Sequence, residues 1–127
     1  MKLLDTLVLV SAMNPDDRHH KAGMGHLRDL QSVEGVYVPS ATLIEFDLVL
    51  RNNRYTEAEI AETWTALSPF IEKKFLGAGP SVHLLAVKLR SEGLTYFDSL
   101  ITAFARETRS TVITRDAEIS KHVGTEW

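Results

Sequence analysis

The sequence predicts an α/β fold in which helices cover both faces of a parallel sheet. Short apolar and β-branched runs alternate with longer segments of helical periodicity, and strands that are separated by helices pair in parallel. Acidic residues also follow two predicted strands directly, at Asp5 and Asp116. Ligand-binding residues of open α/β sheets gather at this carboxyl edge. We therefore expect a three-layer α/β/α sandwich around a parallel sheet.

The N-terminal half is expected to begin with a short strand at residues 3–4 and a turn of helix in the apolar stretch 6–13. A helix over 17–30, a strand over 36–38 and a helix over 40–50 are expected to follow. Pro15 and the acids that follow it are typical of a first helical turn, so a helix is predicted to begin near Asp17. Gly23 and Gly25 weaken that helix. Pro39 closes the second strand, and Ser40 is a suitable cap for the next helix.

The C-terminal half is expected to contain three further helices, one strand and a short last helix. Thr56 and Glu59 match a capping box, and an apolar stripe at helical spacing follows it. The Gly-rich segment 77–80 interrupts the chain. The later elements are predicted at residues 82–89, around 97–104, at 111–114 and at 117–123, from helical spacing and β-branched content.

Length and composition suggest one globular domain over residues 1–127, with 44% hydrophobic and 24% charged residues. The absence of cysteine excludes a disulfide scaffold, a thiolate zinc site and a cysteine nucleophile. No apolar run reaches membrane-spanning length, and Asp5 comes too early for a signal peptide, so we expect a cytoplasmic protein with no membrane partner. The net charge of −3 disfavours tight non-specific nucleic-acid binding but leaves a nuclease open.

Four acidic residues lie among apolar neighbours at the ends of predicted strands or within predicted helices: Asp5, Glu45, Asp98 and Asp116. A carboxylate among core residues is costly unless a partner neutralises it. The sequence offers no matching set of buried Lys or Arg residues. The cheapest partner for several clustered carboxylates is Mg²⁺ or Mn²⁺, which points to metal-assisted chemistry on phosphate esters.

Taken singly, three of these acids have ordinary structural explanations. Asp5 and Asp116 can act as helix caps, and Asp98 lies in a first turn, where the helix dipole favours an anion. Glu45 lies inside a helix, so no cap explains it, although pairing with a nearby Arg remains an alternative. Asp47 lies on nearly the opposite face of the same helix, and we therefore expect Glu45 rather than Asp47 at a shared site.

Other catalytic motifs are absent. The histidines show no HExxH spacing, no GxxxxGK[ST] loop is present, and no serine has a GxSxG context. A zinc protease, a P-loop enzyme and an α/β-hydrolase are therefore not supported.

The chain resembles the PIN-domain family over nearly its full length. The resemblance is carried, in order, by Leu4-Asp5-Thr6, Leu43-Ile44-Glu45-Phe46, Phe97-Asp98-Ser99-Leu100-Ile101-Thr102-Ala103 and Ile113-Thr114-Arg115-Asp116. It implies the three-layer fold and metal-dependent cleavage of RNA, often as the toxin of a VapBC-type pair with an antitoxin protein. Ile119 departs from the aromatic residue that many members carry, and the chain is short after Gly124.

The resulting hypothesis is an Mg²⁺- or Mn²⁺-dependent endoribonuclease. Asp5, Glu45 and Asp98 hold one or two ions, with Asp116 bound directly or through water. Thr6 and Thr114 orient carboxylates or waters. Arg115 meets phosphates of the RNA. The apolar stripe in the range 56–75 also suggests a homodimer.

Three rival functions make different demands on the sequence. A haloacid-dehalogenase-like phosphatase needs a second acid two residues after the first, where Leu7 stands. An Mg²⁺-dependent receiver-like signalling domain needs an early acidic pair and a late Lys, and neither is clear. A catalytically silent PIN-like module that binds RNA or protein remains an alternative.

Overall fold

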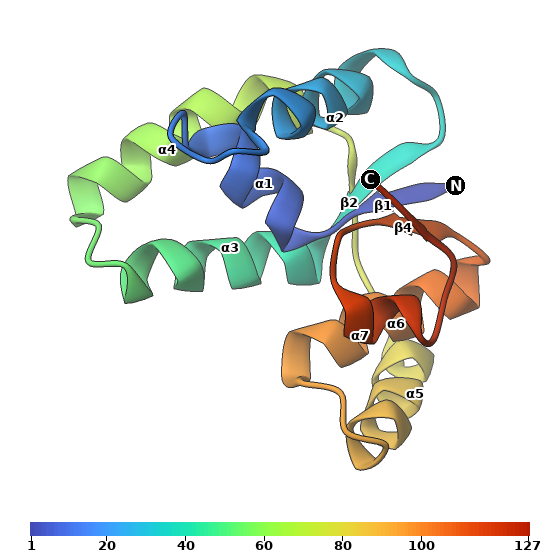
Figure 1. Ribbon diagram of the computed structural model, residues 1–127. Coiled ribbons are helices and arrows are strands. Elements are labelled where there is room, and N and C mark those ends of the chain that lie inside the picture. Colours follow the sequence, from blue (N-terminus) through green and yellow to red (C-terminus); the bar gives the residue numbers. More distant parts are fainter.

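The computed structural model describes residues 1–127 and contains a five-stranded sheet between helical layers (Figure 1). The strand order is β3-β2-β1-β4-β5, and every neighbouring pair is parallel. The strands are β1 (Lys2–Leu4), β2 (Val36–Pro39), β3 (Phe75–Leu76), β4 (Thr111–Ile113) and β5 (Thr125–Glu126). The chain moves outward from β1 to β3 and then crosses to the other side of β1. The predicted three-layer α/β/α architecture is confirmed.

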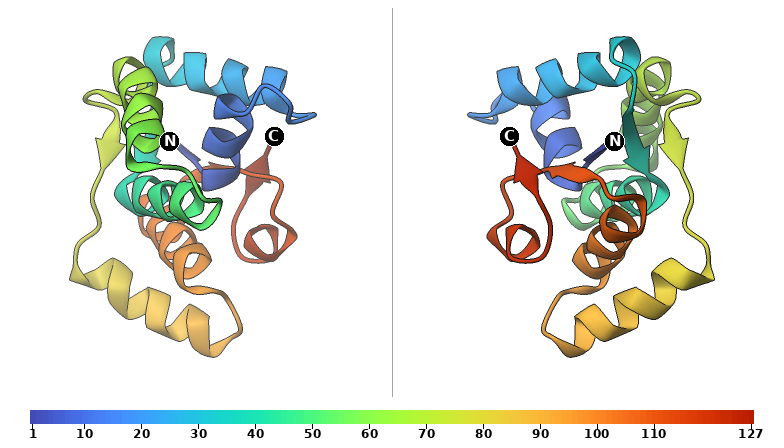
Figure 2. Two further views of the ribbon diagram at one scale, coloured as in Figure 1. Left: turned by 90° about the vertical axis from the view of Figure 1, so that its left-hand side faces the viewer. Right: turned by 90° about the vertical axis from the view of Figure 1, so that its right-hand side faces the viewer.

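Seven helices connect the strands: α1 (Thr6–Met13), α2 (His20–Ser32), α3 (Ser40–Asn52), α4 (Glu57–Ile71), α5 (Pro80–Ser91), α6 (Tyr96–Thr108) and α7 (Ala117–Ser120). The sheet separates the first four helices from the last three (Figure 2). Because side chains alternate along a strand, Leu4 and Ile113 enter the core of α1–α4, while Leu3 and Val112 enter the core of α5–α7.

None of the seven helices combines the length and the apolar character that crossing a bilayer requires.

Several expected elements differ from the observed ones at their ends. The capping box at Thr56 and Glu59 is present, with reciprocal bonds of 2.9 and 3.1 Å. α2 begins at His20 rather than near Asp17, because the Asp17 carboxylate accepts a bond from the His19 amide at 2.7 Å and closes a turn there. The two-residue strands β3 and β5 were not predicted with these bounds, and α7 ends at Ser120.

The apolar stripe of α4 faces the protein's own core. Ile60, Leu67 and Ile71 are buried against α1, α2 and the sheet, and the Trp64 indole donates a hydrogen bond to Asp47 at 2.9 Å. The expectation that this stripe forms a subunit contact is therefore wrong for its buried members. Periodicity predicts an apolar face but does not say what covers it.

Gly23 allows α2 to pack closely on α1. A Cβ atom at this position would lie 2.7 Å from the Ala12 amide nitrogen and 2.9 Å from the Ser11 Cβ atom. Both atoms belong to a buried helix that cannot move without disturbing the core. Gly25, two residues away, has no atom within 4 Å of the equivalent position.

We expect Gly23→Ala to lower the free energy of unfolding by about 1–3 kcal/mol, because overpacking displaces α1. Gly25→Ala is the matched control and should raise it by about 0.5–1 kcal/mol through helix propensity alone. Urea unfolding of both variants measures the difference. Equal shifts in the two variants would contradict the close contact between the helices.

Candidate functional site

The site lies where β1 and β4 end side by side, at the point where the strand order reverses. Leu3 pairs with Val112 and Leu4 with Ile113, so the next residues, Asp5 and Thr114, are neighbours. The Asp5 amide donates to the Ile113 carbonyl at 3.2 Å, and the Thr114 hydroxyl donates to the Asp5 carboxylate at 2.7 Å. Asp5 is only 3% exposed. Ligands of open α/β sheets bind at this reversal point.

The first turns of α3 bring Glu45 to the same place. The buried Thr42 hydroxyl donates to the Leu4 carbonyl at 2.9 Å and ties α3 to the end of β1. Glu45 follows less than one turn later, and its carboxylate accepts a hydrogen bond from the Thr6 hydroxyl at the start of α1. Two threonines thus hold two carboxylates: Thr114 holds Asp5, and Thr6 holds Glu45.

Asp98 and Asp116 approach from the other helical layer. Asp98 lies in the first turn of α6. Asp116 caps α7, where its carboxylate accepts bonds from the amides of Glu118 at 2.7 Å and Ile119 at 3.3 Å. The Asp116 amide in turn donates to the Thr114 hydroxyl at 3.0 Å. The capping role of Asp116 is therefore real and coexists with its place beside Asp5.

The pKa values of three of these carboxyl groups, Asp5, Glu45 and Asp98, are raised. Burial is the largest cause that raises the pKa of Asp5, Glu45 and Asp98. The negative charge of Asp116 raises the pKa of all three further, and Asp5 and Asp98 also raise that of Glu45. None of the four forms an ion pair, since the salt bridges of the protein lie elsewhere.

Asp47 provides the contrast within α3. Its carboxylate accepts hydrogen bonds from Arg51 and Trp64, each at 2.9 Å, which lower its pKa. It is thus neutralised away from the site, as its position on the helix predicts.

Hard carboxylate oxygens without cationic partners suit a divalent ion such as Mg²⁺ or Mn²⁺. In the structure, however, no three Asp, Glu or His side chains are arranged so that they could hold one ion. Local donors draw the carboxylates apart: Thr114 binds Asp5, Thr6 binds Glu45, and the α7 amides bind Asp116. The donor chemistry therefore fits a metal, and metal binding requires side-chain rotation toward a common point.

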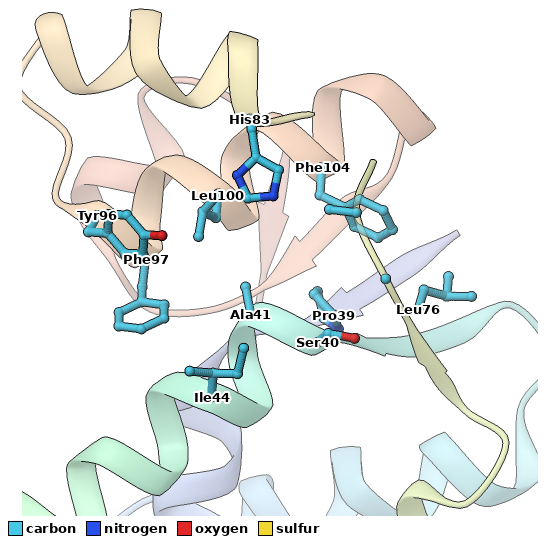
Figure 3. A pocket seen from close by; sticks show the side chains of 12 residues that line it. Pro39, Ser40, Ala41, Ile44, Leu76, His83, Tyr96, Phe97, Leu100 and Phe104 are labelled. Carbon is cyan, nitrogen blue, oxygen red and sulfur yellow. The ribbon is translucent and has the colours of Figure 1, made fainter. Parts of the chain in front are cut away.

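An apolar hollow of about 350 Å³ adjoins the acids. Two of its lining residues directly precede an acid in the chain, Ile44 before Glu45 and Phe97 before Asp98. Figure 3 shows Ala41 and Ile44 of α3 on one side of the hollow, with Leu100 and His83 across from them. The acidic site therefore has an apolar flank between α3 and the α5–α6 layer.

Two contributors to the site region carry no sequence signal. Thr42 is an ordinary polar residue in a first helical turn, and only the fold reveals its bond to Leu4. Trp127 meets the predicted substrate residue Arg115, whose guanidinium lies 4.7 Å from the centre of the indole ring. Arg115 itself is exposed beside Thr114 and Asp116.

Removal of one carboxylate should stabilise the metal-free protein. Burial raises the pKa of folded Asp98 above its ordinary value of 3.8, so the folded state binds more protons between the two values. The free energy of unfolding therefore falls as the pH rises through that window. In chelator at neutral pH, Asp98→Asn should have a higher melting temperature than the wild type and a free energy of unfolding that is larger by about 1 kcal/mol. As the pH rises from about 4 to about 7, the variant should lose less stability than the wild type does.

Thermal melts of the wild type and the variant in chelator at several pH values measure this effect. A lower melting temperature for Asp98→Asn would mean that Asp98 acts only as a favourable first-turn charge, worth up to about 1 kcal/mol.

Comparison with solved structures shows the same fold in several proteins. One is FitAcB from Neisseria gonorrhoeae, with 23% identity and a TM-score of 0.72, covering 98% of this chain and 96% of that chain. VapBC2 from Rickettsia felis bound to a promoter DNA fragment has 17% identity and a TM-score of 0.76, covering 99% and 98%. VapC20 from Mycobacterium tuberculosis, a sarcin-ricin loop cleaving toxin, has 15% identity and a TM-score of 0.74, covering 95% and 94%.

No curated protein sequence matches this chain. The sequence does match the PIN domain over residues 2–124, which is nearly its whole length. The sheet order, the strand-end acids and this match agree, and the chain belongs to the PIN domain family.

Proposed function

We propose that this protein is a metal-dependent ribonuclease that cleaves phosphodiester bonds of single-stranded RNA. The observation that carries the proposal is that four carboxylates from separate segments lie near enough to influence one another electrostatically and have no cationic partner. Such a set is unfavourable for stability, which is expected where function rather than folding requires it. The similar structure described as a sarcin-ricin loop cleaving toxin supports RNA as the substrate class.

In this proposal Asp5, Glu45, Asp98 and Asp116 hold Mg²⁺ or Mn²⁺. A bound divalent ion lowers the pKa of water and neutralises charge on the phosphate. Thr6 and Thr114 fix the orientation of Glu45 and Asp5 through the hydrogen bonds that the structure shows. The exposed Arg115 contacts a phosphate of the substrate.

An antitoxin protein is the proposed regulatory partner. Several similar structures are complexes, including VapBC2 from Rickettsia felis and a toxin–antitoxin complex from Klebsiella pneumoniae with 20% identity and a TM-score of 0.67. Co-expression with the product of an adjacent small gene tests this part. A stable complex with suppressed RNA cleavage is expected.

RNA cleavage should require Mg²⁺ or Mn²⁺ and should stop in chelator. Asp5→Asn and Asp98→Asn should each reduce the rate about a hundredfold or more, as the loss of a group that stabilises transition-state charge commonly does. Asp47→Asn is the control, because Asp47 is paired with Arg51 and should change the rate little. Cleavage of a labelled single-stranded RNA measures all three. Wild-type rates in the Asp98 variant would refute the assignment, and an inactive wild type would favour the silent binding module.

A homodimer is also proposed, through a surface other than the α4 stripe. Helix α5 buries Val82, Ala86 and Leu89 on one side but leaves Leu84 75% and Val87 57% exposed on another. Leu84 and Val87 line a second depression, which adjoins the apolar hollow because the two share Ala78 and His83. Ile44, Leu48 and Tyr96 add exposed apolar surface nearby. In the proposed two-fold dimer, the exposed α5 side chains of one protomer contact the hollow of its partner.

Leu84→Glu should convert the dimer to a monomer, because it places a charge at the centre of the apolar contact. Phe75→Glu is the control, since Phe75 is 54% exposed but lies on the edge strand β3. Light scattering after size exclusion, at tens of micromolar protein, gives the mass. A monomeric wild type, or a dimeric Leu84→Glu variant, would rule out this interface.

A further inference from the structure

A basic and aromatic cluster surrounds Trp127 beside the acidic site. The Arg115 guanidinium lies 4.7 Å from the centre of the indole ring. The rings of His19 and His26 meet the indole edge-on, with centroid distances of 5.8 and 5.2 Å. Arg18 extends the cluster through a 3.0 Å hydrogen bond to the His19 ring. Side chains from three separate segments thus converge on one indole.

The cluster lies at the same edge of the sheet as the four carboxylates. The Thr114 amide donates to the Glu126 carbonyl at 2.9 Å, so Trp127 follows directly beside the residue that holds Asp5. Trp127 packs against the core of α1–α4, and its contact with Arg115 places the guanidinium on that side of the sheet. β5 is two strands from β1, which corresponds to roughly 10 Å. A nucleic-acid strand at the acids can therefore reach the cluster with its neighbouring nucleotides.

The guanidinium of Arg115 has no partner other than the indole. It forms neither a hydrogen bond nor an ion pair, although other arginines do: Arg51 pairs with Asp47, and Arg90 donates to the Ser99 hydroxyl. The cation–π contact with Trp127 restrains the guanidinium while its N–H groups stay free. Free guanidinium donors match the oxygens of a phosphate.

The negative charge of the site disfavours the binding of a polyanionic RNA strand, and a nearby cation would offset this repulsion. Four carboxylates and a net charge of −3 repel a polyanionic strand. The cations of Arg18 and Arg115 belong to the cluster around Trp127, and they contact aromatic rings on which bases can stack. This combination suits a single-stranded nucleic acid.

We propose that Arg115, held on Trp127 and flanked by His19 and Arg18, is a subsite that binds the backbone phosphates of single-stranded RNA next to the cleavage site. This subsite rests on the ribonuclease function proposed above. It is the surface that would bind the RNA nucleotides next to those at the acids. Arg115 makes the phosphate contact, and Trp127 is a positioning residue that fixes the guanidinium.

The experiment measures binding without cleavage, using Asp98→Asn protein and a labelled single-stranded RNA of about 12 nucleotides. This length lies within known single-strand site sizes. In that background, Arg115→Gln should raise the Kd for RNA about fivefold. It should also reduce the slope of log K against log salt by about 0.7, which is the loss expected for one phosphate contact. Trp127→Ala should reproduce much of the loss, and Trp127→Phe should retain most of the affinity. Arg28→Gln is the control, because Arg28 is exposed and unpaired on α2 and should change neither quantity.

A second readout locates the contact. The chain has two tryptophans, so in a Trp64→Phe background the fluorescence reports Trp127 alone, and it should change saturably as RNA is added. An Arg115→Gln variant that binds with the affinity and salt slope of Arg28→Gln would overturn the subsite, as would an unresponsive Trp127. Failure of the ribonuclease proposal looks different: wild-type protein with Mn²⁺ leaves RNA intact while Trp127 still responds and Arg115→Gln still weakens binding.

Discussion

The pairing of β1 with β4 is the constraint on which the site depends. The register of Leu4 with Ile113 places the Asp5 carboxylate beside the Thr114 hydroxyl, and that hydroxyl also accepts from the Asp116 amide. Two acids from opposite ends of the chain are thereby joined through one side chain. A slip of one residue would turn Asp5 toward the other face of the sheet and remove it from the site. The apolar residues on both faces, Leu3 and Leu4, make such a slip costly because each is fully buried in its own core.

The packing that brings the acids together also buries their negative charges, which is unfavourable for folding. Burial and mutual repulsion raise the pKa of Asp5, Glu45 and Asp98, so the ionised site destabilises the metal-free fold. Threonine hydroxyls and the α7 amides relieve part of this cost by donating to the individual carboxylates. A divalent cation is the partner that would neutralise the set as a whole. Metal binding and fold stability should therefore be linked in this protein.

The elements with long periodic patterns could be predicted from the sequence, and the shortest ones could not. The helices around Glu45 and Asp98 have clear apolar spacing, and helix geometry alone separated Glu45 from Asp47. β3 and β5 have two residues each, and they are strands only because β2 and β4 lie beside them. The α4 stripe was recognised as apolar, but its burial against the protein's own core depends on tertiary packing. For the same reason the contact of Thr42 with Leu4 and that of Trp127 with Arg115 have no local signal.

The location of a bound metal ion would test the proposed role of the four carboxylates directly. Crystals grown with Mn²⁺ would show the ion by its anomalous scattering, independently of any activity. The ion is expected between β1, α3 and α6, held by Asp5, Glu45 and Asp98, with Asp116 bound directly or through water. Its peak should be lost in Asp98→Asn crystals. A crystal saturated with Mn²⁺ that shows no ion among these four carboxylates would contradict the central claim.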